Sequence, residues 1–181
     1  MINILQKAAT GRVVLLLFII TMIVYLIILL YSIPAVTAQA PGMKLFDMSP
    51  SGYNPSYAEK LLKAIGPGGR EVYMKRQLPI DFIYPGLFAV TYTLMIVWLL
   101  GKRFDPKSRI FLLALIPAAA GLFDYFENVG IILMLKSYPN ISPMMVHVSS
   151  TFSILKSVLT ILFYLILCFG FLILFLKRNR S

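Results

Sequence analysis

The segment IFLLALIPAAAGLFDYFENVGIILML, residues Ile110–Leu135, is apolar over most of its length. As a helix rising 1.5 Å per residue it is long enough to cross about 30 Å of hydrocarbon. Asp124, Glu127 and Asn128 nevertheless stand inside it. A charged residue at the centre of a membrane helix costs about 2.5–3.5 kcal/mol, so such residues normally face a bundle interior or a wet cavity. The segment therefore predicts a membrane helix that carries a polar site.

Three further segments have the length and composition of membrane spans: Val13–Ile33, Pro79–Leu100 and Val148–Leu176. Of the 181 residues, 59% are hydrophobic and only 13% are charged, which is typical of polytopic membrane proteins and excludes an ordinary soluble domain. Because short connections join the last three spans, those spans should be antiparallel neighbours. We expect residues 1–181 to form one all-α domain, a bundle of four transmembrane helices.

The first loop, residues 34–78, begins with a stretch rich in proline and glycine, which predicts turns. Asn54-Pro55 is then a typical helix start, and Gly66-Pro67 is a typical helix end. The residues between them are apolar on one face, so we expect a short amphipathic helix lying on the membrane or over the bundle mouth. The loop is too short to bury a core of its own and should act as an extracytoplasmic cap.

Basic residues flank the spans and predict the orientation, because short cytoplasmic segments retain positive charge. Lys and Arg precede the first span, occupy the connection between the second and third spans, and follow the fourth span. In a chain with four spans these three segments lie on the same side of the membrane, so both termini should be cytoplasmic. The net charge of +10 is spread over these flanks, which favours contact with anionic lipid headgroups over binding of nucleic acid. The flanking residues are Lys7, Arg12, Lys102, Arg103, Lys107, Arg109, Lys177, Arg178 and Arg180.

Helical spacing predicts which polar side chains meet. Asp124, Glu127 and Asn128 share one face of the third span, because they lie three and four residues apart. The fourth span carries a polar stripe that contains a lysine, and the second span carries an acidic and aromatic stripe. Lipid offers hydroxyls and carboxylates no partner, so the three stripes should converge. We expect the ligand-binding residues to be Asp124, Glu127, Asn128, Lys156, Asp81, Tyr84, Tyr92 and Ser153.

Arg70 is a separate candidate. It follows Gly68-Gly69 shortly before the second span, where backbone N–H groups and a guanidinium could hold a lipid phosphate. The alternative interpretation is that the glycine pair is a flexible joint between two helices. The sequence leaves both interpretations open.

Three functions fit these residues. The first is an outward-opening intramembrane pocket for a lipid or amphipathic small molecule. The second is a membrane-embedded enzyme that modifies a lipid, with Asp124 and Glu127 as the catalytic acid and base. The third is a structural or ion-conducting subunit, in which the polar residues join helices or pass protons. Each of these functions is compatible with a homo-oligomer or with a membrane partner subunit. No His-x-x-x-His or Cys-x-x-Cys spacing is present, so we expect neither a metal nor a cofactor.

The chain resembles a group of small, uncharacterised four-helix membrane proteins of bacteria. The resemblance rests on residues spread over nearly the whole chain: Gly68-Gly69-Arg70, Tyr73, Asp81, Tyr84-Pro85, Asp124-Tyr125-Phe126-Glu127-Asn128, Tyr138-Pro139 and Thr151 to Lys156. It implies a location in the bacterial inner membrane and no particular activity. In layout alone, with a long first loop and intramembrane carboxylates, the chain is also similar to the sterol-isomerase and sigma-2-receptor superfamily, although its first span contains no acidic residue.

Overall fold

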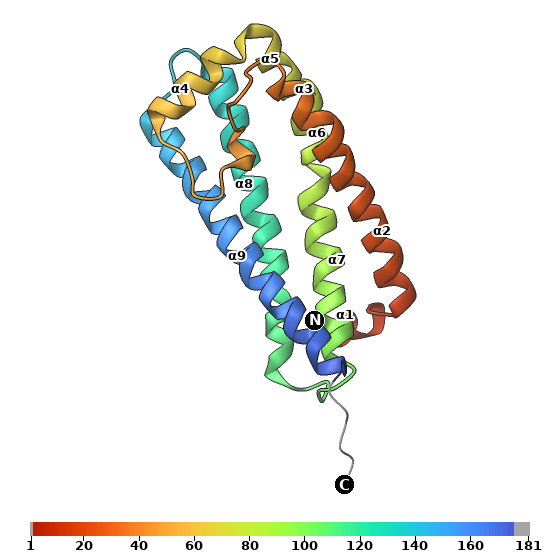
Figure 1. The fold of residues 1–181 in the computed structure, drawn as a ribbon. Coiled ribbons are helices and arrows are strands. Elements are labelled where there is room, and N and C mark those ends of the chain that lie inside the picture. The colour runs from red at the N-terminus through yellow and green to blue at the C-terminus, as the bar shows by residue number, and fades with distance from the viewer. Residues whose placement is uncertain (1, 176–181) are drawn as a thin grey trace.

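The computed structural model describes residues 2–175, which form helices and loops without a strand (Figure 1). The α-helices are α1 Ile2–Ala8, α2 Gly11–Ile27, α3 Ile33–Thr37, α4 Pro55–Ala64, α5 Gly66–Val72, α6 Leu78–Asp81, α7 Ile83–Leu100, α8 Leu115–Ser137 and α9 Pro143–Phe175. Two π-helical turns, Ile28–Ser32 and Tyr73–Gln77, join α2 to α3 and α5 to α6, and 3₁₀ turns occupy Phe46–Met48 and Arg109–Ala114.

Four helical paths are long and apolar enough to cross a membrane: Gly11–Thr37, Gly66–Leu100, Arg109–Ser137 and Pro143–Leu172. The prediction of an all-α chain with four such helices is confirmed. Each of the first, second and fourth paths extends several residues beyond the predicted span at one end or both. Leu176, the last residue of the fourth predicted span, lies outside the described residues, as do the basic residues that follow it.

The long helices pack in the order α9, α8, α7, α2 (Figure 1). Within the described residues, α2 and α9 do not pack along each other, although α9 also touches α7. The start of the chain and the loop after α7 meet at one end of the bundle, where Gln6 Nε2 donates to the carbonyl of Pro106 at 3.0 Å. Arg103 of the same loop donates to the carbonyl of Leu174 at 3.0 Å, which places the end of α9 there too.

Prolines explain both π-helical turns. Pro34 and Pro79 each follow one of the turns by two residues, and each lies in the first turn of the next α-helix. A proline inside an α-helix lacks an N–H and clashes with the carbonyl four residues earlier, so a wider turn before it relieves the clash and lets the helical path continue. Pro34 was expected to end the first span; instead the helix bends through the turn and runs on to Thr37.

Gly66 ends α4 with a positive φ of 63°, which an L side chain rarely adopts. The interpretation of Gly68-Gly69 as a flexible joint is wrong, because both residues are helical within α5. Gly69 is buried, and a Cβ added to it would lie 3.0 Å from Cβ of Gln39 and 2.8 Å from Cβ of Ile65. A glycine is needed there because α5 packs closely on the segment after α3.

The cap, defined here as residues 38–65, covers the end of the bundle opposite to α1 (Figure 1). Its Leu45, Phe46 and Leu61 are fully buried in one apolar core with Tyr73 and Met134. A second apolar core fills the α1 end, around α7. The buried polar side chains of α6, α8 and α9 lie mostly between these two cores.

Candidate functional site

Lys156 of α9 is the centre of the polar cluster. Its Nζ lies 3.1 Å from Oδ1 of Asp124, and it also forms an ion pair with Oε2 of Glu127. The two acidic residues are on the same face of α8, as their spacing predicted. Lys156 is mostly buried, Asp124 is buried, and Glu127 is fully buried. One cation therefore joins two acidic side chains and holds α9 against α8.

Asn128 lies beside this ion pair and is also fully buried. Within residues 2–175, neither its amide nitrogen nor its amide oxygen makes a hydrogen bond of ordinary geometry, and the same holds for Oε1 of Glu127. Asn128 is close to Asp81 of α6, whose side chain is only 6% exposed. The polar face of α8 thus continues from the Lys156 ion pair toward a second acidic residue.

The cap contributes an acidic residue of its own. Asp47, in the 3₁₀ turn Phe46–Met48, accepts hydrogen bonds from Tyr73 OH and from Gln77 Nε2, each at 2.9 Å. Gln77 is in turn hydrogen-bonded through its Oε1 to the hydroxyl of Ser32. Ser32 and Gln77 end the two π-helical turns, so these turns bring both polar side chains inward to hold Asp47.

Hydrogen bonds fasten the cap to α9. Tyr53 OH lies 2.7 Å from Ser149 Oγ, and the Tyr53 backbone N–H donates to Ser150 Oγ at 2.8 Å. Ser153 Oγ donates to the carbonyl of Ser49 at 3.1 Å. Burial raises the pKa of the Tyr53 hydroxyl above its ordinary value, so this group stays protonated. The serine stripe of α9 therefore binds the cap.

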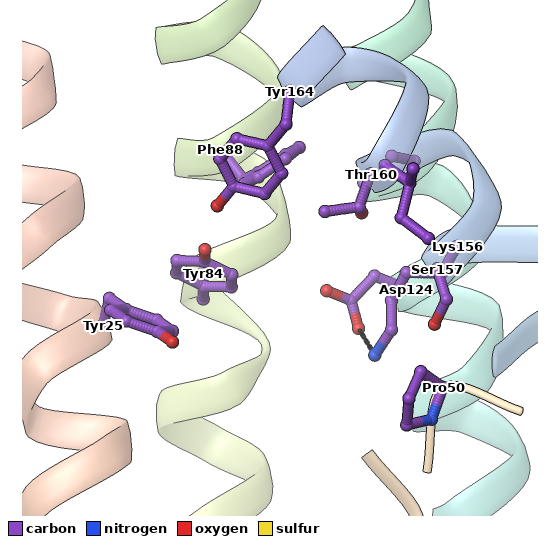
Figure 2. Close-up of a pocket in the computed structure, with 12 residues that line it drawn as sticks. Tyr25, Pro50, Tyr84, Phe88, Asp124, Lys156, Ser157, Thr160 and Tyr164 are labelled. Carbon is purple, nitrogen blue, oxygen red and sulfur yellow. Dashed lines mark hydrogen bonds and ion pairs between the residues drawn. The ribbon is translucent and has the colours of Figure 1, made fainter. Parts of the chain in front are cut away.

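Two adjoining cavities lie around the ion pair (Figure 2). The aromatic cavity, of about 310 Å³, is lined by Tyr25, Pro50, Tyr84, Phe88, Ala120, Gly121, Asp124, Lys156, Ser157, Thr160, Ile161 and Tyr164. The acidic cavity, of about 270 Å³, is lined by Tyr25, Ile28, Leu29, Ile33, Asp47, Met48, Asp81, Tyr84, Asp124 and Lys156. Tyr25, Tyr84, Asp124 and Lys156 line both, so the two cavities meet at the ion pair.

The cavities open to the side of the bundle. Pro50 of the cap lies at one end of the aromatic cavity, and Tyr25 of α2 and Tyr164 of α9 lie on different walls of it (Figure 2). Tyr25 is 40% exposed and Tyr164 is 50% exposed. These two partly exposed residues line the aromatic cavity and belong to helices that do not pack along each other in the described residues, so we place the mouth between α2 and α9.

The structure brings together most of the predicted ligand-binding residues. Asp81, Tyr84, Asp124 and Lys156 line the cavities, and Glu127 and Asn128 lie directly behind them. Ser153 adjoins Glu127 and also binds the cap, whereas Tyr92 and Arg70 lie away from the cavities, as described next.

Tyr92 is buried one turn beyond Phe88, with its ring 4.6 Å from that of Phe163. Ser153 binds the cap. Arg70 donates to the carbonyl of Leu62 at 2.7 Å and lies 4.2 Å from the ring centre of Tyr138, away from both cavities. Its guanidinium thus holds α5 to its neighbours.

Among the cavity residues that were not predicted, Tyr25 and Asp47 carry polar groups that face the acidic cavity. Thr21, Tyr25 and Ser32 lie four and seven residues apart on the otherwise apolar first span, and this spacing is a signal for a polar face. Asp47 carries no comparable signal, because it lies in an irregular loop whose path is decided by tertiary packing.

Among residues 2–175, no group of three or more His, Cys, Asp or Glu side chains is placed to hold a metal ion. Comparison with known proteins finds no matching family model, no similar curated protein and no similar solved structure.

Proposed function

We propose that this chain is an integral membrane protein whose bundle encloses a pocket for a lipid or another amphipathic small molecule. The pocket consists of the aromatic and acidic cavities. The supporting observation is that a buried ion pair, Asp124–Lys156, lies at the inner wall of cavities whose mouth is between two apolar helices. An amphipathic ligand matches both features, because its headgroup can contact the polar wall while its chain leaves through the mouth.

The exposed faces of α2 and α9 support membrane insertion. Large apolar side chains cover them, and only 17% and 11% of their most apolar windows are buried inside the bundle. Such faces would be unfavourable in water and are favourable against acyl chains. With the mouth between these helices, a ligand would enter sideways from the bilayer. The basic flanks favour an orientation with both termini in the cytoplasm, and the bacterial resemblance favours the inner membrane.

Filling the aromatic cavity tests this proposal. Thr160 lines that cavity, so Thr160→Trp should occupy it without altering an ion pair. Thr151, two and a half turns earlier on α9, is exposed, and Thr151→Trp is the matched control. After gentle detergent extraction, native mass spectrometry should detect a lipid or other small molecule on the wild type and on Thr151→Trp, and none on Thr160→Trp. Equal retention by all three proteins would contradict the proposal.

A second function is favoured by one specific observation. Asp81 faces the same cavity as the Asp124–Lys156 pair but forms no ion pair among the described residues. Carboxyl groups in unlike surroundings can serve as acid and base in one reaction, which suits a lipid-modifying enzyme. A deletion strain should then show an altered lipid profile that the wild-type gene restores and Asp124→Asn does not. Full rescue by Asp124→Asn would count against an enzyme.

The structure offers less support for an ion-conducting module. Toward the α1 end, the aromatic cavity ends at Phe88, whose ring lies 5.3 Å from that of Phe163. Tyr92 packs against both rings, and all three side chains are buried. This aromatic layer separates the polar cluster from the α1 end of the bundle.

A further inference from the structure

The charge around the two cavities is unbalanced. Four acidic side chains face or adjoin them, Asp47, Asp81, Asp124 and Glu127, against one amine, Lys156. Lys156 is already paired with Asp124 and Glu127. The formal charge of these five side chains is thus negative, and the excess lies on the side of the acidic cavity.

Asp81 is the residue that most needs a partner. Asp81 is only 6% exposed, and it lines the acidic cavity. Within the described residues it forms no ion pair. Asp47 lines the same cavity, and its hydrogen-bond donors in the described part of the chain, Tyr73 and Gln77, are uncharged. Asp81 and Asp47 thus line one cavity without an ion pair of their own among the described residues, because the one amine there, Lys156, is paired with Asp124 and Glu127. In such surroundings charges interact more strongly than in water.

Aromatic rings line the cavities beside the place where a positively charged headgroup would bind. Tyr25 and Tyr84 line both cavities, with their ring centres 5.6 Å apart (Figure 2). Ring faces attract cations, and the attraction grows when the cation is removed from water. Beyond them, Phe88, Ile161 and Tyr164 give the aromatic cavity apolar walls that suit a hydrocarbon chain.

We propose that the pocket selects amphiphiles whose headgroup carries a positive charge, such as a long-chain amine. The ammonium group lies against Asp81 and Asp47 beside the rings of Tyr25 and Tyr84, and the alkyl chain leaves between α2 and α9. An anionic headgroup is disfavoured, since it would meet two carboxyl groups that form no ion pair among the described residues. This inference rests on the proposed function and specifies the ligand of the same pocket.

The test compares three probes of equal chain length: hexadecylamine, hexadecan-1-ol and hexadecanoate. Each competes with a photoactivatable hexadecylamine for the full-length protein in phosphatidylcholine nanodiscs. We expect hexadecylamine to compete at the lowest concentration. Asp81→Asn should weaken its binding by about tenfold or more, because the carboxylate partner of a buried charge pair is lost. Asp81→Glu, which keeps the charge, should restore part of the affinity.

Asp105→Asn is the matched control, because Asp105 lies in the exposed loop after α7, at the opposite end of the bundle, and should leave binding unchanged. Equal competition by all three probes, or unaltered hexadecylamine binding in Asp81→Asn, would overturn the charge preference while leaving a pocket. If no probe binds and Thr160→Trp retains every co-purified molecule, the proposed function itself fails. The wild-type comparison decides the charge preference even if a variant does not fold.

Discussion

Lys156 of α9 and Asp124 of α8 are joined by an ion pair of 3.1 Å that forms the wall shared by the two cavities. Glu127 binds the same amine from one helical turn further along α8. Removing the amine would therefore leave two buried acidic residues without a cation.

Lys156→Met should destabilise the protein by about 3 kcal/mol, because breaking a buried ion pair on one side leaves its partner uncompensated. Titration of unfolding in mixed micelles with sodium dodecyl sulfate would measure the change. Adding Glu127→Gln and Asp124→Asn to this variant should recover part of the loss, since the triple variant has no unpaired charge there. If Lys156→Met unfolds at the same detergent fraction as the wild type, the ion pairs do not hold α9 to α8.

Gly121→Ala should push α8 away from α7. A Cβ at this position would lie 2.6 Å from the carbonyl oxygen of Pro85 and 3.0 Å from Cβ of Ala89, so the helix backbones must move apart. We expect a loss of about 1–3 kcal/mol, as for other overpacked sites, and reduced retention of any co-purified ligand because Gly121 lines the aromatic cavity. Gly68→Ala is the control, since a Cβ there meets nothing within 4 Å. Equal melting temperatures for the two variants would argue against close packing at Gly121.

Tyr53→Phe should loosen the cap by about 1 kcal/mol, because Ser149 loses its 2.7 Å hydrogen-bond partner. The variant should also alter the response to alkali. In the wild type the folded state raises the pKa of this hydroxyl, so its stabilising effect is complete below the unfolded value of about 10 and is lost as the pH rises above it. The stability difference between wild type and Tyr53→Phe should thus shrink above about pH 10. Limited proteolysis in the cap at several pH values would measure this stability difference. A difference that grows with pH would contradict the hydrogen bond between Tyr53 and Ser149.

Thr21 and Thr91 provide the main polar contact between α2 and α7, with 2.7 Å between their hydroxyl oxygens and both side chains fully buried. A double-mutant cycle with Thr21→Val and Thr91→Val should give a coupling energy of about 0.6 kcal/mol, the average for hydrogen bonds between membrane helices, and at most about 1.7 kcal/mol. Since α2 forms one side of the mouth, Thr21→Val should also speed ligand exchange. A coupling energy of zero would show that apolar packing alone holds α2 in place.

The polar site could be predicted in large part because its members lie on regular helices. Spacing of three and four residues placed Asp124, Glu127 and Asn128 on one face, and the high cost of a charge among apolar residues indicated that Lys156 would meet them. Tyr92 follows the same spacing from Phe88 but is buried in the aromatic layer. Spacing alone does not show where along a face the cavity ends.

Asp47, Arg70 and the π-helical turns could not be predicted by the same reasoning. Asp47 is more than thirty residues from Asp81 in the chain and reaches the acidic cavity only because the apolar residues of the cap pack on α8 and α9. Arg70 could bind a phosphate or a carbonyl, and its hydrogen bond to the carbonyl of Leu62 follows from the way α5 packs next to α4. Contacts of this kind depend on which surfaces pack together, and the spacing of residues along a short segment does not indicate which surfaces those are.

The amino-acid sequence by itself determined four apolar helices and an acidic face on one of them that needs a partner. It also determined the helix boundaries to within about a turn or two, except at the start of the second path, which begins at Gly66 and not at Pro79. These are local properties, since hydropathy and helical period act over a few neighbouring residues. Only the tertiary structure decided that the cap lies over the polar cluster, that the mouth lies between α2 and α9, and that Asp81 lines the acidic cavity without an ion-pair partner among the described residues. Those features depend on long-range packing, in which residues far apart in the chain compete for the same buried space.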